Sequence, residues 1–207
     1  MLLLHGEQYL KIETLPIPTS ATLVSETRLL EVLDKQKAAA VTTITTTKDK
    51  DSGKVIFENQ STVVIRKAGG FNGKKTGKDR GAATAVNKPP SRKPDAVAET
   101  KTSPTQAALY RLAGGDMNPL HVDPNFASAG GFDKPILHGL CFFGISTKHI
   151  VDNFGQIKDI KVRFTSSVYP GETVVTEMWK EGNKVIFTAK TKERGDQVLG
   201  AAAATLA

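Results

Sequence analysis

Cysteine is nearly absent from the 207-residue chain, which has only Cys141, and aromatic residues make up 6%. A single cysteine excludes an internal disulfide and fits a reducing compartment such as the cytoplasm. No apolar run approaches ~18 residues, so the sequence predicts no helix that spans a membrane. The opening Met-Leu-Leu-Leu lacks a basic leader, and the closing Ala-Thr-Leu-Ala is not a Ser-Lys-Leu address. We therefore expect no targeting signal at either end of this chain.

Acidic residues are outnumbered, with 21 Asp and Glu against 28 Lys and Arg and a net charge of +7. Residues 66–101 hold ten of the basic and three of the acidic residues, so this segment accounts for the whole excess. A nucleic-acid interface usually interleaves aromatic side chains with basic ones, and here only Phe71 does so. We therefore predict a solvated segment and no nucleic-acid partner, with attraction of a phosphate-bearing ligand as the weaker alternative.

The chain divides into three parts by composition. Residues 68–103 are rich in Gly, Pro and Lys, lack apolar periodicity and predict a linker. Before it, residues 1–67 contain two strand-like runs around the turn Asp51-Ser52-Gly53, which indicates a hairpin. After it, residues 104–207 end in strands that break at Gly182-Asn183 and Gly195-Asp196.

Two helices are expected between the linker and the last strands. Asp123 followed by Pro124 is a typical helix start, and Gly130-Gly131 ends that short helix. The next run, 136–155, is apolar on most sides over about five turns, which indicates a helix wrapped by other elements. A long helix inside a curled antiparallel sheet is the hot-dog arrangement. We therefore predict an α+β fold of this kind, with one half-fold on each side of the linker.

Two ionisable side chains lie close together in the stretch Gly-Gly-Asp-Met-Asn-Pro-Leu-His. Asp116 and His121 flank Pro119, which prevents a regular helix between them. Such a pair can serve as a general base and its partner, and Asn118 can hold a water or a carbonyl. Gly139 lies where the long helix should begin, and a free N–H at a helix N-terminus can stabilise an oxyanion. Together these groups are suited to adding water next to a carbonyl, although a surface turn with an exposed histidine is the plainer interpretation.

The motif YRLAGGDMNPLHVDPNFASAGGFDKPILHGLCFFG, residues 110–144, resembles that of the (R)-specific enoyl-CoA hydratases. These belong to the MaoC-like hot-dog family and include the hydratase domains of peroxisomal multifunctional enzymes. Further similar stretches are LLHGEQYL, VLDKQK, GGFNGKK, VRFTSSVYPGETVVTEMWKEGN and KERGDQVL. The resemblance extends over nearly the whole chain, and it implies an α+β double hot dog.

The resemblance implies syn hydration of trans-2-enoyl-CoA to (R)-3-hydroxyacyl-CoA in peroxisomal fatty acid β-oxidation, by a homodimer and without a cofactor or metal. Asp116 and His121 would activate the water, Asn118 would complete the motif, and the N–H of Gly139 would hold the thioester oxygen. Acyl-CoA contacts would come from His5, Gly6, Lys35, Asp116, Met117, Asn118, Pro119, Leu120, His121, Gly139 and Phe164. A non-catalytic acyl-CoA-binding or assembly module and a hot-dog thioesterase are the alternatives.

Two departures from the family pattern are visible. The family has Leu-Ser-Gly-Asp where this chain has Leu-Ala-Gly-Gly-Asp, so one residue is inserted between Tyr110 and Asp116. If Tyr110 to Leu112 form a strand, the insertion requires a bulge or reverses their facing. The family also has a long helix before the first motif, so the N-terminal half is expected to be incomplete.

Four further residues are given structural roles. We expect His138 to be a hydrogen-bonding residue near the helix start, and His149 to lie at the surface late in the same helix. Cys141 and Trp179 should contribute to packing.

Overall fold

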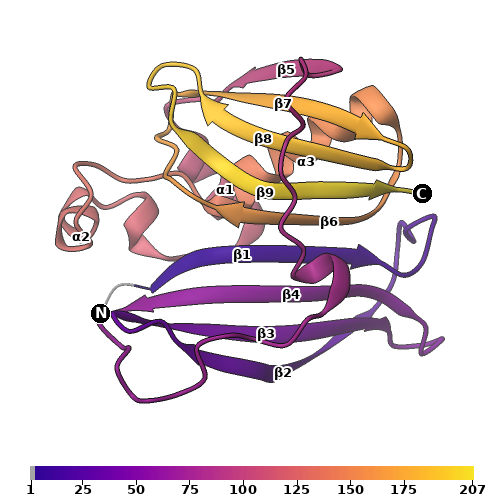
Figure 1. Cartoon of the computed structure of the whole chain (residues 1–207), viewed down its shortest axis with the longest axis horizontal. Coiled ribbons are helices and arrows are strands. Elements are labelled where there is room, and N and C mark those ends of the chain that lie inside the picture. The colour runs from indigo at the N-terminus through magenta and orange to yellow at the C-terminus, as the bar shows by residue number, and fades with distance from the viewer. Residues whose placement is uncertain (1–2) are drawn as a thin grey trace.

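The computed structural model describes residues 3–207 and forms one antiparallel sheet of nine strands (Figure 1). The strand order is β2-β3-β4-β1-β6-β9-β8-β7-β5, and β1 pairs with β6 at the centre. The strands are β1 (Leu3–Ile12), β2 (Leu23–Asp34), β3 (Ala38–Asp49), β4 (Val55–Arg66), β5 (Ala96–Lys101), β6 (Ile157–Phe164), β7 (Thr173–Glu181), β8 (Lys184–Thr191) and β9 (Gln197–Leu206). The predicted hairpins at Gly53, Gly182 and Gly195 are confirmed, and each of these glycines has a positive φ.

Helices occur in the described chain only between β5 and β6, apart from the 3-10 turn η1 (Gly81–Ala83). They are α1 (Gln106–Gly114), the 3-10 turn η2 (Pro119–His121), α2 (Pro124–Ala129) and α3 (Gly139–Phe154). The predicted start of α2 is confirmed, because the Asp123 carboxylate accepts hydrogen bonds from the N–H groups of Asn125 and Phe126. No helix among residues 3–207 is long and apolar enough to cross a membrane.

The core lies between α3 and the C-terminal strands β5 to β9. Figure 1 shows α3 running behind these strands. The α3 side chains of Phe142, Phe143 and Ile150 are buried here. They belong to one core cluster with fully buried side chains from the sheet, which are Ile160, Val174, Met178, Val185, Phe187 and Leu199. Cys141 is buried in this core as predicted. The predicted long helix is therefore confirmed, but it begins at Gly139 and not at Ile136, because the backbone of His138 is extended.

His149 corrects the sequence-based interpretation. It is 5% exposed and not at the surface. Its ring nitrogens lie 2.8 Å from the hydroxyl of Thr100 on β5 and 2.9 Å from that of Thr176 on β7. Hydrogen bonds to two strands allow a polar ring to remain inside the core, and they fix α3 on the sheet.

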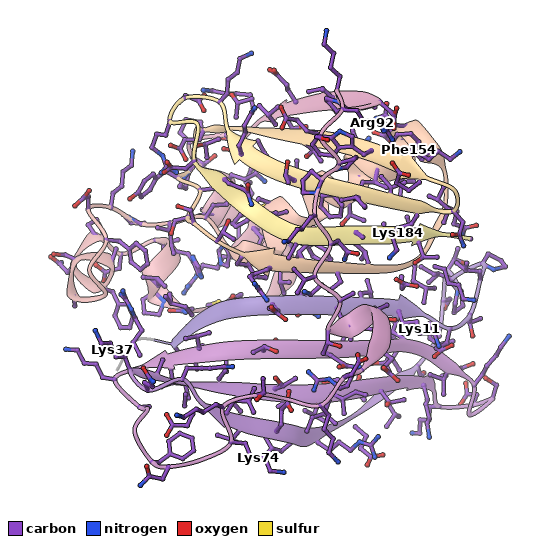
Figure 2. All side chains as sticks on the ribbon, in the orientation of Figure 1. Lys11, Lys37, Lys74, Arg92, Phe154 and Lys184 are labelled. Carbon is purple, nitrogen blue, oxygen red and sulfur yellow. The ribbon has the colours of Figure 1, made fainter. Side chains whose placement is uncertain are left out.

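The segment expected to be a solvated linker is ordered against the sheet. Its last part forms the edge strand β5, which pairs with β7. Residues 84–95, here called the strap, cross the sheet on the side opposite α3 (Figure 1). The Lys161 ammonium donates to the carbonyl of Ala85, and the Trp179 indole, buried as predicted, donates to that of Arg92. Figure 2 labels Arg92 near the β5 end of the strap.

The N-terminal strands β1 to β4 carry no α-helix among residues 3–80. The outermost strand, β2, exposes large apolar side chains, with Leu23, Val24 and Leu29 between 49% and 61% exposed. The predicted incompleteness of this half stays a prediction.

Candidate active site

A cavity of about 640 Å³ lies where the two halves of the sheet meet. Its N-terminal wall comes from β1 and β4 and includes Leu4, His5, Gly6, Val63 and Val64. Its other walls come from α1, from the turn at residues 116–121, from the start of α3 and from the end of β6. The cavity thus brings the motif at residues 110–144 together with side chains more than 40 residues before it in the chain.

The turn at residues 116–121 is built by its own polar side chains. The Asp116 carboxylate accepts the N–H of Asn118 at 3.0 Å, and the Asn118 side-chain oxygen accepts the N–H of Leu120 at 3.1 Å. Pro119 begins the 3-10 turn η2, as its fixed φ permits. Asp116 and His121 are therefore held on one turn at the cavity wall, while Leu120 anchors the turn in a small apolar cluster with Ala127 and Ile136.

His121 has one ring nitrogen committed to a hydrogen bond. Its Nδ1 lies 2.8 Å from the carbonyl oxygen of Ile136, which can only accept, so Nδ1 carries the proton. Burial lowers the pKa of His121 and thereby favours the neutral ring, although the Ile136 carbonyl and the charge of Asp116 act in the opposite direction. In that neutral state Nε2 has a free lone pair and can accept a proton.

His138 does not have the hydrogen-bonding role expected of it. Its side chain is 2% exposed, and neither ring nitrogen has a hydrogen-bond partner. The ring stacks on His121 with 3.7 Å between centroids, and its Nε2 lies 3.9 Å from Asp116 Oδ2. Burial, and next the proximity of His121, lower the pKa of His138 to about 4, so this ring is neutral near pH 7.

Gly139 is the first residue of α3 and lines the cavity. A residue at this position has no intrahelical acceptor for its N–H, and the helix dipole is positive there. A Cβ on Gly139 would lie 3.2 Å from Cε1 of Phe164, so a side chain here would crowd the wall beside that N–H. The position of Gly139 is therefore compatible with the predicted role of oxyanion donor.

The other predicted binding residues divide into two groups. His5, Gly6 and Phe164 line the cavity, and the rings of His5 and Phe164 lie 4.6 Å apart. Lys35 does not line it, because its ammonium donates to the Lys75 carbonyl at 2.6 Å on the loop after β2. Met117 and Pro119 do not line it either; Met117 is 64% exposed.

The strand considered for residues 110–112 is wrong, because these residues lie in α1. The inserted glycine therefore makes no bulge. Gly114 is the last residue of α1, and Gly115 caps the helix in the left-handed conformation, with φ 71° and its N–H bonded to the Arg111 carbonyl. Glycine is the usual residue at this position because it has no Cβ to clash. The chain then turns directly into Asp116.

Sequence reasoning did not single out several residues of this site. Tyr110 lines the cavity, and its ring packs against that of His138 with centroids 4.8 Å apart. Its position in the quoted motif was the available signal. Leu4 lies in the similar stretch LLHGEQYL, which was the available signal for it. Val63 and Val64 gave no signal, because they are ordinary strand residues brought in by pairing of β4 with β1.

The titratable atoms of Asp116, His121 and His138 all lie within 4.8 Å of one another. Within residues 3–207, this is the one cluster of three or more His, Cys, Asp or Glu side chains that could hold a metal ion. These donor types could hold a metal ion or transfer a proton, and both ring nitrogens of His138 are shielded from solvent.

Comparison with known proteins agrees with the fold and the motif. The family described as MaoC like domain matches residues 85–202, and the MFE-2 hydratase 2 N-terminal domain matches residues 1–67. The chain is 58% identical over its whole length to the peroxisomal hydratase-dehydrogenase-epimerase of Neurospora crassa, but covers only 23% of that protein. It is 44% identical to the probable enoyl-CoA hydratase 2 of Dictyostelium discoideum, covering all of this chain and 70% of the relative.

Among solved structures, the chain resembles the full-length peroxisomal multifunctional enzyme type 2 from Drosophila melanogaster. The TM-score is 0.88 at 39% identity, over 99% of this chain and 37% of that one. The fold is therefore a hot-dog fold. Because the first domain match covers more than half of the chain, and the Dictyostelium relative is matched over more than two thirds of its length, this chain belongs to the MaoC-like family.

Proposed function

We propose that the chain catalyses the reversible syn hydration of trans-2-enoyl-CoA to (R)-3-hydroxyacyl-CoA in fatty acid β-oxidation. One observation carries the proposal: Asp116, His121 and the N-terminus of α3 line the same cavity. The names of the relatives, which include enoyl-CoA hydratase 2 and peroxisomal multifunctional enzyme type 2, support this reaction class.

The reaction requires a base for the water, a proton for C2 and a stabiliser for the thioester oxygen. The water oxygen bonds to C3, and its proton passes to the Asp116–His121 pair, where Nε2 of His121 is the free acceptor. The pair returns one proton to C2, so that atoms balance with no cofactor. Both groups lie on one turn and reach the substrate from one side, which gives syn addition. A positioned acid or base contributes roughly 10²–10⁴-fold to the rate.

The N–H of Gly139 donates to the thioester oxygen, which gains negative charge as water adds to C3. An oxyanion donor of this kind contributes roughly 10²–10³-fold. Asn118 positions the pair, since its side chain and backbone N–H shape the turn. His5, Gly6, Leu120 and Phe164 would contact the acyl thioester in the cavity, and Met117, Pro119 and Lys35 would contact the coenzyme outside it.

Several finer features belong to the same proposal. We infer a double hot dog with an acyl-chain half at residues 1–67, a connecting segment at 68–103 and a catalytic half at 104–207. Leu4, Val63 and Val64 give the cavity an apolar wall, which favours medium to long acyl chains. A homodimer in the peroxisome is inferred from the family resemblance and from the names of the relatives.

The test is to mix the protein with crotonyl-CoA or decenoyl-CoA and follow both the conjugated enoyl thioester and free thiol. Loss of the enoyl absorbance without free thiol supports hydration. Release of thiol would replace the proposal with a thioesterase, and binding with an unchanged spectrum would replace it with a non-catalytic module. Chiral analysis of the 3-hydroxyacyl product then tests the (R) configuration.

A further inference from the structure

His138 is a polar side chain buried without a partner beside the proposed acid–base pair. It is 2% exposed, and both ring nitrogens lack hydrogen bonds. A buried polar group left unpaired lowers stability, so such an arrangement calls for a local reason. The proposed hydration uses Asp116, His121 and Gly139, and His138 has no direct part in it.

We propose that His138 is a positioning residue that holds both members of the acid–base pair, an inference that rests on the proposed hydratase function. One contact is the stack on His121, with centroids 3.7 Å apart and the ring planes 27° apart. The other is the approach of Nε2 to Asp116 Oδ2, across 3.9 Å. No other side chain of the described chain touches His121 and Asp116 in these two ways.

The stack on His138 restricts a rotation of the His121 ring that the hydrogen bond of His121 alone would permit. The bond from Nδ1 to the Ile136 carbonyl sets one point of the ring, but the ring can still rotate about that bond. A flat neighbour at 3.7 Å removes this rotation and so aims the Nε2 lone pair. The Tyr110 ring packs against His138 at 4.8 Å and holds it in place.

The approach to Asp116 gives a role to one of the two unpaired nitrogens of His138, Nε2. The Asp116 side chain is 47% exposed in the open cavity, whereas Nε2 of His138 is shielded from solvent. A gap of 3.9 Å is too long for a hydrogen bond and closes with a shift of about 1 Å. An acyl thioester that covers Asp116 would favour this shift, and the Nε2–H would then donate to the carboxylate and orient it. This hydrogen bond would therefore form only in the substrate-bound state.

Three substitutions separate the two contacts. His138→Phe keeps a flat ring against His121 but has no donor, and His138→Gln keeps a donor near Nε2 but has no ring. His138→Ala loses both contacts. A matched control is His149→Gln, which alters another buried histidine associated with α3, outside the cavity.

We expect kcat to fall about 10-fold in each of the first two variants and roughly 100-fold in His138→Ala, since small misplacements of catalytic groups have effects of this size. KM should stay within about threefold, because His138 orients catalytic groups and does not bind the coenzyme. The control should lose stability and keep its kcat. Wild-type kcat for folded His138→Ala would overturn the proposal, and so would a change confined to KM.

A second readout does not depend on activity. The chain has only four histidines, so the NMR titration of His121 can be followed without crowding. The groups facing His121 are His138, the Asp116 carboxylate and the Ile136 carbonyl. His138→Ala should admit water and raise the pKa of His121 toward its ordinary value, while His138→Phe should keep it low. An unchanged titration in His138→Ala would overturn the positioning role, whereas an inactive wild type with the expected titration would overturn only the hydratase function.

Discussion

Replacing Gly115 with alanine should destabilise the protein, whereas the same change at the adjacent Gly114 should stabilise it. Gly115 has φ 71°, and the left-handed conformation costs a residue with a Cβ roughly 1–2 kcal/mol. No atom lies within 4 Å of the Cβ position, so backbone strain is the whole cost. Gly114 is helical, and a Cβ there would lie 3.5 Å from Tyr110 Cε1, an ordinary contact. Alanine should therefore gain about 0.5 kcal/mol at this position from its helix propensity.

Urea unfolding of the two variants measures this difference directly. We expect Gly115→Ala to lose about 1 kcal/mol, which in a chain of this size lowers the melting temperature by roughly 2–4 °C. Gly115→Asn should lose less, because asparagine tolerates the left-handed region. Deleting one of the two glycines should damage the site, since the next residue would have to cap α1 and Asp116 would move. A Gly115→Ala variant as stable as Gly114→Ala would refute the capping role, and a deletion that raises kcat would show that the insertion displaces Asp116.

Four other outcomes are expected. Asp116→Asn and His121→Gln should each lower kcat by roughly 10²–10⁴-fold. The double variant should lose little more activity, because the effects of substituting groups that act as a unit are not additive. Full activity of Asp116→Asn would contradict the catalytic role of Asp116. Asn118→Ala should reduce kcat less and cost about 1 kcal/mol, since it removes only the bond to the Leu120 N–H. Trp179→Ala should weaken the strap and cost about 3 kcal/mol with little change in kcat, as measured by urea unfolding and enoyl absorbance. Burial lowers the pKa of all four histidines in the folded state, so the unfolded chain binds more protons below pH ~6.5. The free energy of unfolding should therefore fall between pH 7 and pH 5, by up to about 1.4 kcal/mol per pH unit for each histidine. A urea midpoint that does not change over this pH range would contradict this prediction.

The features that the sequence predicts correctly are those set by near neighbours in the chain. Asp123 followed by Pro124 starts α2 because the cap bonds and the fixed φ act within one turn. The turn glycines 53, 182 and 195 end strands for a similar local reason, namely a positive φ. The turn at residues 116–121 is also local, since Asp116 and Asn118 bond to backbone groups two residues away.

The features that it misses depend on pairing across long distances. The β5 segment, Ala-Val-Ala-Glu-Thr-Lys, is short and follows a stretch typical of linkers, and its partner β7 is more than 70 residues away. His149 lies in the core because Thr100 and Thr176 meet its ring from two strands. The helix α1 is a different case, since Gln-Ala-Ala-Leu-Tyr-Arg-Leu-Ala-Gly has strong helix formers and a glycine after it. The local residues thus favour the observed helix, and the strand considered for residues 110–112 is wrong.

The geometry of the proposed acid–base pair and oxyanion donor depends little on the N-terminal strands β1 to β4. His121 is held by the Ile136 carbonyl, the Asp116 carboxylate by the N–H of Asn118, and Gly139 by its place at the start of α3. All of these contacts lie within residues 115–139 and rest on the core beneath α3. The N-terminal strands supply only the opposite wall of the cavity, through β1 and β4. Changes in β2 or β3 should therefore alter stability and assembly, whereas changes in Leu4 or Val63 should alter which acyl chains fit and leave the proton-transfer step unchanged.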